Sequence, residues 1–184
     1  MYNLLHKFRV YLFDKLSNNR PSYTGLRQQP VLYLGCGKID IGMNTIFGYF
    51  PSPYYYKGYC HIEARCADAI IHIGNNNHFN NNFNIIAEHG TIKVGDNCLV
   101  GTNVLIINSD FHPISIKARH LGTQKSKDVI IGNNVFIGSN VSICKGVNIG
   151  DNAVIANGSV VFDDVKANTI VRGNPAIFYK KIDE

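Results

Sequence analysis

The chain has 184 residues, 45% of them hydrophobic, which is enough for one well-buried core but short for two domains. A formal net charge of +5 favours anionic partners such as phosphates but is too small to indicate nucleic acid, and no DNA- or RNA-binding motif accompanies it. No apolar run approaches the roughly 20 residues of a membrane span, and no signal-peptide cleavage pattern follows the N-terminus, so we expect a cytoplasmic protein.

Residues 1–30 are expected to form an N-terminal helix and a linker. Large apolar residues recur there at near-helical spacing, with basic residues among them: Leu4, Leu5, Phe8, Leu12 and Leu16. This pattern predicts a short amphipathic helix over residues 2–16. The helix either covers the end of the domain that follows, which we favour because stacked repeats need end covers, or associates weakly with the inner membrane. Residues 17–30 are polar and contain proline, as is typical of a linker.

Residues 31–184 carry a six-residue repeat, which is most regular between Ile131 and Lys166. An aliphatic residue opens each unit: Ile131, Ile137, Ile143, Ile149, Ile155 and Val161. The fourth position holds types that tolerate a left-handed backbone: Asn134, Asn140, Gly146, Asn152, Gly158 and Asp164. A period of six fits neither a helix nor a flat strand. Short strands joined by a corner every six residues instead predict a parallel β-helix.

The repeat is interrupted twice. Residues 50–59, with two prolines and four tyrosines, are expected to leave the coil as an excursion. Between Ile107 and Val129 the pattern lapses for about twenty residues, and such a gap between regular repeats indicates a functional loop. The five cysteines, Cys36, Cys60, Cys66, Cys98 and Cys144, show no C-x-x-C spacing and are expected to be buried thiols rather than disulfides or metal ligands.

The second interruption opens with Asn108-Ser109-Asp110-Phe111-His112-Pro113. With the repeat array, residues 130–138 and the closing residues 173–176, this motif makes the chain resemble the hexapeptide-repeat acyltransferases over roughly residues 60 to 179. It most resembles the maltose, galactoside and nodulation-type sugar O-acetyltransferases and their relatives in surface-polysaccharide biosynthesis. The resemblance implies an all-β fold, a left-handed parallel β-helix with a protruding loop, against the usual right-handed crossover rule. It also implies a homotrimer with active sites between subunits.

The activity implied by the resemblance is acetyl-CoA-dependent O-acetylation of a sugar hydroxyl, in capsule, O-antigen or exopolysaccharide biosynthesis. A hydroxyl is a poor nucleophile, so its attack on a thioester needs a base, and a neutral histidine with an unperturbed pKa of about 6.5 suits that task. His112 matches the catalytic histidine of the family. Neither Cys98 nor Cys144 has a partner base at recognisable spacing, so we expect direct transfer without an acyl-enzyme.

Four further residues are candidates for acceptor binding. Asp110 either orients His112 or contacts the acceptor, and a solvated loop aspartate is equally compatible with its position. Glu88 and His89 stand where sugar acetyltransferases often keep an acceptor-binding carboxylate. Asn82 matches an acceptor-contacting asparagine of the family, but backbone geometry alone also explains an asparagine at this corner. Both interpretations of Asn82 stay open.

The cofactor side of the site is assigned by the same resemblance. Ser139 matches the position near the thioester, where a backbone amide could stabilise an oxyanion. Ala156 and Asn157 match residues that line the arm of acetyl-CoA, and Lys180 matches a basic residue that meets its phosphates.

Two departures from the family pattern affect phosphate recognition. The usual Thr-Lys pair is replaced by Phe162 and Asp163, and the basic residue expected after Pro-Ala is Ile177. A cofactor other than acetyl-CoA therefore stays open. Phosphate binding must rest on a neighbouring subunit or on the basic residues that remain: Arg172, Lys180 and Lys181.

Other functions are weighed against this one. A sugar-nucleotide N-acetyltransferase uses the same fold and a similar base, and a non-catalytic β-helix scaffold would carry the same repeats. A zinc enzyme of this fold needs three converging histidines, and no His-x4-His pair is present, so we expect no metal.

Overall fold

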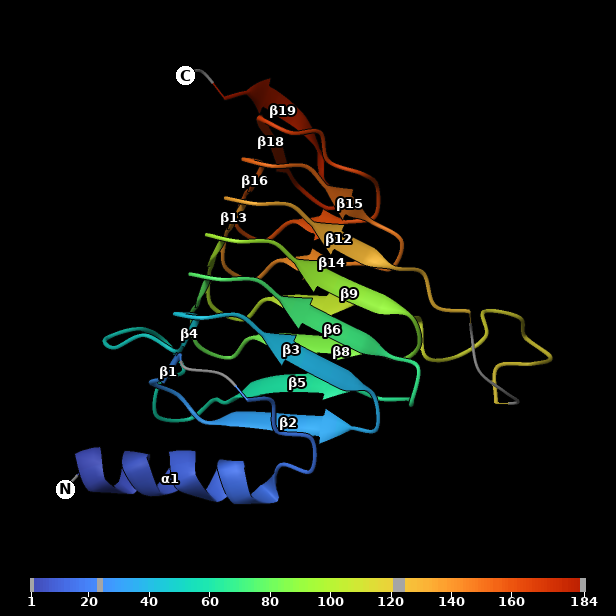
Figure 1. Cartoon of the computed structure of the whole chain (residues 1–184). Helices are drawn as coiled ribbons and strands as arrows, with labels where there is room; N and C mark the ends of the chain where they lie inside the picture. The colour runs from blue at the N-terminus through green and yellow to red at the C-terminus, as the bar shows by residue number, and fades with distance from the viewer. Residues whose placement is uncertain (1, 23–24, 121–124, 183–184) are drawn as a thin grey trace.

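The structure, a computed structural model, describes residues 2–22, 25–120 and 125–182. These residues form one α-helix, α1 (Tyr2–Leu16), and short β-strands in three sheets (Figure 1). Within each sheet, strands from successive turns of the chain lie side by side.

Sheet A contains β1 (Leu26–Arg27), β4 (Ile46–Phe47), β7 (His78–Phe79), β10 (Leu99–Val100), β13 (Phe136–Ile137), β16 (Val154–Ile155), β18 (Thr169–Arg172) and β19 (Ile177–Lys181). Sheet B contains β17 (Val160–Val161), β14 (Ser142–Ile143), β11 (Leu105–Ile107), β8 (Asn84–Ala87), β5 (Cys60–Ala64) and β2 (Val31–Gly35). Sheet C contains β15 (Asn148–Ile149), β12 (Val129–Ile131), β9 (Thr91–Val94), β6 (Ile70–Ile73) and β3 (Lys38–Ile41).

Consecutive strands visit the three sheets in a fixed rotation. Strand β2 lies in sheet B, β3 in sheet C and β4 in sheet A, and the same order continues along the chain to β17. Strands that meet within a sheet after one such turn run parallel, as where Ile137 aligns with Ile155, whereas β18 and β19 pair antiparallel. The expectation of a mostly β chain built of parallel strands with one short helix is confirmed. The left-handed sense of its winding stays a prediction.

The core is a column of aliphatic side chains between the three sheets. The residues that open each repeat unit from Ile131 to Val161 are at most 2% exposed. The second apolar position of each unit is buried as well, for example Val141 and Ala153 at 0%. Burying one such branched side chain contributes about 1.5–3 kcal/mol relative to leaving it in water. The six-residue pattern therefore stabilises the coil along its whole length.

The corners follow the predicted asparagines and glycines with one exception. Five of the six predicted corner residues have φ between 54° and 80°: Asn134, Asn140, Gly146, Asn152 and Gly158. The prediction for Asp164 was wrong, because the unit that begins at Val161 is two residues shorter than the others. Val165 aligns with Ile149, and the next left-handed corner falls at Asn168, with φ 57°. The Asp164 carboxylate instead accepts the Asn148 N–H at 2.7 Å.

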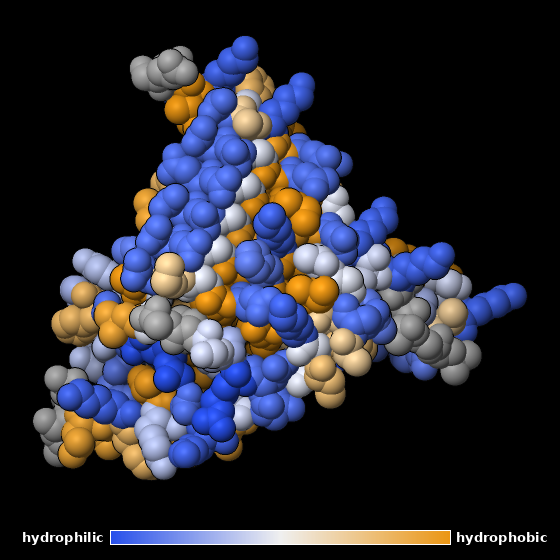
Figure 2. All heavy atoms as spheres, viewed as in Figure 1, coloured by the Kyte–Doolittle hydropathy of each residue, from blue (hydrophilic) through white to orange (hydrophobic). Residues whose placement is uncertain are grey.

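Asparagine side chains also join successive corners. Asn134 donates its side-chain amide to Asn152 at 2.8 Å, and Asn152 donates to Asn168 at 2.8 Å. The hydrophilic band along the left edge of Figure 2 lies over these turns between sheets C and A. The asparagine richness of the chain is thus explained in large part by hydrogen bonding along the coil.

Two segments outside the regular coil matter for the site. The described residues between β11 and β12, 108–120 and 125–128, include a loop that protrudes from the coil at the right of Figure 1, as the lapse in the repeat predicted. At the N-terminus, α1 lies across the end of the coil against β2, and Leu26–Arg27 of the predicted linker form β1, which pairs with β4. No helix in the described part of the chain is long and apolar enough to cross a membrane.

Candidate active site

His112 lies at the start of the protruding loop, five residues after β11 ends at Ile107. Its side chain is exposed and has no hydrogen-bond partner among the described residues. The residue before it, Phe111, has φ 61°, which is unusual for a bulky side chain. The Phe111 N–H donates to Ser109 Oγ at 3.0 Å, and this bond stabilises the local turn from which His112 leaves the coil.

A buried hydrogen-bond network holds this turn to the neighbouring coil. Glu88, only 5% exposed, accepts a short hydrogen bond from the Ser109 hydroxyl, and Ser109 itself is 0% exposed. The Glu88 N–H donates to Asn108 Oδ1 at 2.9 Å, and Asn108 Nδ2 donates to the His89 carbonyl at 2.5 Å. The end of β8 therefore fixes the first residues of the loop. The predicted acceptor residue Glu88 lies below the surface with its carboxylate already engaged.

Charged side chains flank the turn on both sides. The Arg65 guanidinium lies 4.6 Å from the centre of the Phe111 ring and donates to Glu63 at 2.8 Å. That hydrogen bond lowers the pKa of Glu63 against the opposing effect of burial. On the other side, Lys145 pairs with the carboxylate of Asp110. Asp110 is thus held by a cation rather than hydrogen-bonded to His112.

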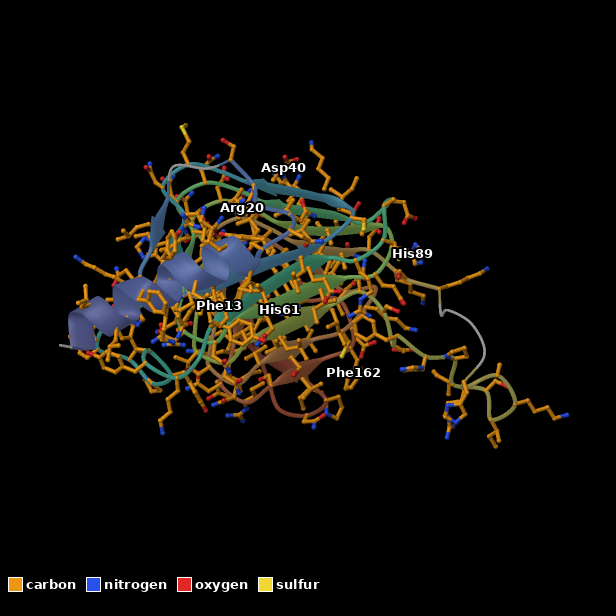
Figure 3. All side chains as sticks on the ribbon, turned by 90° about the horizontal axis from the view of Figure 1, so that it is seen from below. Phe13, Arg20, Asp40, His61, His89 and Phe162 are labelled. Atoms are coloured by element: carbon orange, nitrogen blue, oxygen red, sulfur yellow. The ribbon has the colours of Figure 1, made fainter. Side chains whose placement is uncertain are left out.

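His89 lies at the base of the protruding loop (Figure 3). Its Nδ1 is 2.8 Å from Asp68 Oδ1, and this hydrogen bond lowers the pKa of Asp68. The His89 side chain is 37% exposed, so part of it is accessible to solvent. His89, Glu88, Asp110 and His112 all lie where the chain passes from sheet B to sheet C, which we call the B–C corner.

The remaining predicted residues, apart from Lys180 on β19, lie at the other end of the sheet B strands, where the chain passes from sheet A to sheet B, which we call the A–B corner. Ser139 and Asn157 occupy successive levels there, because the Ser139 N–H donates to Asn157 Oδ1 at 2.8 Å. Ser139 Oγ accepts the Thr102 N–H at 3.1 Å. The Ser139 amide is therefore already engaged and does not point a free donor at an oxyanion.

Asn82 belongs to an asparagine ladder at the same corner. Its φ is 61°, its Nδ2 donates to Asn103 Oδ1 at 2.8 Å, and Asn103 donates to Asn140 at 2.9 Å. The Asn82 N–H also donates to Gln29 Oε1 at 2.8 Å. These contacts account for an asparagine at this position without a ligand.

Four of the predicted cofactor residues form a column along the coil axis: Ser139, Ala156, Asn157 and Arg172. The Ala156 N–H donates to the Val171 carbonyl at 3.0 Å, which places Arg172 one level beyond Ala156 and Asn157. The Arg172 guanidinium stacks on the Tyr179 ring at 3.7 Å, and Lys180 is exposed on β19. Small side chains near Ser139 followed by the basic Arg172 fit an extended ligand with a phosphate end, whereas Lys180 lies beside Ile170, near the start of β18.

Within a single chain, the A–B corner and the B–C corner lie far apart. Sheet B separates them, and the five residue steps from Asn103 to Asn108 correspond to roughly 16 Å of extended chain. A pocket of about 320 Å³ opens on sheet A beside the A–B corner, lined among others by Tyr49, Asn80 and Phe136, and His112 does not line it. The candidate site is therefore divided between the two ends of the sheet B strands.

The cysteines show no activated thiol at either corner. Cys60 and Cys98 are buried, Cys66 and Cys144 are half-buried and Cys36 is exposed, so the expectation of burial is only partly confirmed. Burial raises the pKa of Cys60 to about 12 and raises those of Cys98 and Cys144. Among the described residues, no group of three His, Cys, Asp or Glu side chains is arranged to hold a metal ion.

Sequence patterns did not reveal the supporting roles of Ser109, Asn108, Arg65 and Lys145. The first two stand inside the recognised motif, so their place beside His112 was a usable signal. Arg65 and Lys145 contact the loop only because stacking brings distant segments together, and the separation of 35 residues between Lys145 and Asp110 carries no sequence signal.

Comparison with known proteins agrees with this geometry. The sequence model described as the hexapeptide repeat of succinyl-transferase matches residues 91–116 and 128–163. The predicted resemblance to the hexapeptide-repeat acetyltransferases is confirmed, because this repeat model matches the coil and solved acetyltransferases have a similar fold.

The proteins similar to this chain include sugar acetyltransferases. The galactoside O-acetyltransferase of Escherichia coli (strain K12) is 40% identical over 114 residues, which cover 62% of this chain and 55% of that protein. The chain thus spans about half the length of that relative. A solved maltose O-acetyltransferase from Clostridium difficile 630 has a TM-score of 0.54 at 26% identity, covering 100% of this chain and 83% of that one. A galactoside acetyltransferase in complex with coenzyme A has the same TM-score and identity, with 99% and 81% covered.

Proposed function

We propose that this protein is an acetyl-CoA-dependent O-acetyltransferase that acts on a sugar hydroxyl, with surface-polysaccharide precursors as its substrate class. The observation that carries the proposal is the placement of His112: an exposed imidazole on a turn that Glu88 and Ser109 hold rigidly to the coil. A general base must be held within hydrogen-bond reach of the proton it removes, and a fixed backbone serves that requirement. The sugar acetyltransferases among the relatives support the substrate class.

The reaction proceeds by direct transfer. Bound acetyl-CoA supplies the activated acetyl group. His112 removes the proton of the sugar hydroxyl while that oxygen attacks the thioester carbonyl, and the imidazolium then returns the proton to the leaving sulfur. Asp110, held by Lys145, and the exposed part of His89 line the acceptor side, and Glu88 acts as a positioning residue through Ser109. Ser139, Ala156 and Asn157 line the arm of the cofactor, and Arg172 and Lys180 bind its phosphates.

A left-handed homotrimer completes the site. In one chain His112 and Ser139 lie at opposite ends of the sheet B strands, so each needs a partner surface from another copy. The outward side chains of sheet A include Leu99 and Phe136, which are 52% and 49% exposed, whereas sheet C presents Lys38 and Lys93. Closed cyclic packing would cover the apolar wall and place the B–C corner of one chain beside the A–B corner of the next.

The test is a thiol-release assay with acetyl-CoA and a panel of sugars. General-base catalysis contributes about a hundred- to ten-thousandfold, so His112→Ala should lower kcat by that factor while acetyl-CoA binding, measured by calorimetry, is unchanged. His120→Ala, a histidine on the same loop, is the matched control and should keep full activity. Wild-type turnover by His112→Ala would disprove the assignment of the base. Sugar amines acetylated nearly as well by the variant would indicate an N-acetyltransferase, and a protein that does not bind acetyl-CoA would be a scaffold.

A further inference from the structure

Helix α1 turns its polar side toward the coil. His6 Nε2 is 2.6 Å from the Gln28 carbonyl, and Arg9 donates to the Gly58 carbonyl at 2.8 Å. At the end of the helix, Ser17 Oγ accepts the Tyr33 N–H at 2.9 Å. His6, Arg9 and Phe13 recur three or four residues apart and so lie on one side of the helix. This side binds backbone groups of the first coil, where β2 is the edge strand of sheet B.

The opposite side of α1 is apolar and exposed, and we call it the outer face of α1. Its large side chains are exposed by 40% to 76%: Leu4, Leu5, Phe8, Tyr11, Leu12 and Leu16. Their spacing of three and four residues makes one continuous stripe. Monomeric soluble proteins rarely expose contiguous apolar patches of this kind unless the patch binds something. The apolar pattern in the sequence thus faces away from the coil that α1 covers.

The charged side chains of α1 are also divided between its two sides. Lys7 and Lys15 are exposed at the outer face, and Lys15 Nζ lies 5.5 Å from the centre of the Tyr11 ring. Asp14, the acidic residue of the helix, is turned to the coil and pairs with Arg27 at 2.5 Å. The outer face therefore combines apolar side chains with cations and presents no carboxylate. This combination is complementary to a surface that is apolar below and anionic at its boundary.

The position of the helix favours a flat surface over a second copy of the chain. Figures 1 and 3 show α1 lying across the end of the coil, so its outer face points along the coil axis and away from the three sheets. Packing of the side walls against other copies, as in a closed ring, would leave this end uncovered. It would also place several outer faces at the same end of the assembly.

We propose that the outer face of α1 docks the protein on an anionic lipid bilayer, with the helix lying in the plane of the headgroups. Interfacial helices of this kind insert their apolar side chains to about 5–10 Å and gain further attraction from basic residues near anionic lipids. Docking needs no acyl transfer, so it does not rest on the proposed enzymatic function.

The test is flotation of the full chain with vesicles of two compositions. Equal parts of phosphatidylcholine and phosphatidylglycerol should carry the protein to the top of the gradient, and pure phosphatidylcholine should carry at least tenfold less. Replacing Leu4, Phe8 and Leu12 together by Ser should abolish flotation, and Lys7→Glu with Lys15→Glu should reduce it to the level seen with pure phosphatidylcholine. Met43→Ser with Ile70→Ser, exposed apolar residues away from α1, is the matched control and should float like the wild type.

Light scattering without lipid tests whether a second copy of the chain, and not lipid, covers the outer face of α1. The three-Ser variant should keep the mass and the thermal transition of the wild type, because the outer face contacts only lipid in the proposal. A lower oligomer mass in that variant would show that a second copy covers the face, and the proposal would be wrong. Absence of flotation by the wild type, or equal flotation with both vesicle compositions, would overturn it as well.

Discussion

The two corners that flank sheet B use polar side chains in different ways. At the A–B corner, Asn82, Asn103 and Asn140 donate to one another along the coil, and each amide serves the next. At the B–C corner, the contacts run from the buried Glu88 through Ser109 and end at an exposed imidazole. In the first arrangement the asparagine side chains hydrogen-bond to one another, and the same contact recurs at successive levels of the coil. The second does not repeat and leaves a basic group, His112, without a protein partner among the described residues.

This difference separates residues that stabilise the coil from residues that position the proposed catalytic base, His112. A ladder position should affect stability and leave kinetics unchanged. A position in the network around the loop should affect turnover more than stability, because it fixes where His112 stands. The following predictions test the distinction.

Among the residues that support His112 or the coil, the largest effect is expected from Ser109→Ala. Removing the hydroxyl breaks the bonds to Glu88 and to the Phe111 N–H, which would let His112 move. A displacement of about 1 Å can cost up to a hundredfold, so we expect kcat to fall by about ten- to a hundredfold with an unchanged KM for acetyl-CoA. Steady-state kinetics measure this, with Ser142→Ala on sheet B as the control.

Glu88→Gln sharpens the same test, because it keeps an oxygen that accepts the Ser109 hydroxyl. It should lose less turnover than Ser109→Ala and leave the acceptor KM unchanged. A raised acceptor KM would instead mean that Glu88 contacts the sugar directly.

At the ladder, Asn82→Ala should lower stability by about 1–2 kcal/mol, since alanine is strained at a positive φ and cannot donate to Asn103. Asn82→Gly tolerates the backbone and should lose less. Thermal unfolding at a fixed protein concentration gives the comparison, and a shift of about 2–4 °C per kcal/mol is expected for a chain of this size. If both variants kept the wild-type transition but raised the acceptor KM, Asn82 would belong to the site.

Lys180→Ala should raise the KM for acetyl-CoA by up to about fivefold, as expected for an exposed charge worth at most about 1 kcal/mol. The increase should be greater at low ionic strength, where the charge is less screened. Lys93→Ala, an exposed lysine on sheet C, is the control. An unchanged KM at every salt concentration would move the phosphate site elsewhere.

The smallest effect concerns pH. The hydrogen bond from Arg65 lowers the pKa of Glu63 below its ordinary value of 4.5, so the folded state favours the ionised carboxylate. Its contribution, about 0.2–1 kcal/mol for a partly exposed pair, is present above pH 4.5 and is lost as pH falls through the lowered pKa. Unfolding curves of wild type and Glu63→Gln should therefore converge in acid. A difference that persisted there would exclude this linkage.

Much of the fold follows from local rules that the sequence states directly. The period of six, with Ile143 or Ile155 inward and Asn140 or Asn152 at the corner, needs only sterics and burial, and each unit repeats the same solution. The exception, Asp164, shows the limit of that rule. The unit that begins at Val161 is two residues shorter, so Val165 aligns with Ile149 and the next left-handed corner is Asn168, which accepts a hydrogen bond from Asn152 in the coil below.

The sequence by itself determined the hexapeptide coil, the existence of α1 and the protruding loop, because the spacing of apolar and corner residues predicts them. It also identified the candidate base His112, which stands in a contiguous motif. Only the tertiary structure decided that Glu88 is buried beneath Ser109, that the Ser139 amide is engaged by Asn157, and that the predicted site is split across sheet B. It also decided that the apolar side of α1 faces outward. Each of these depends on which residues become neighbours when coils stack, and residues 18 or more positions apart in the chain carry no local signal of that contact.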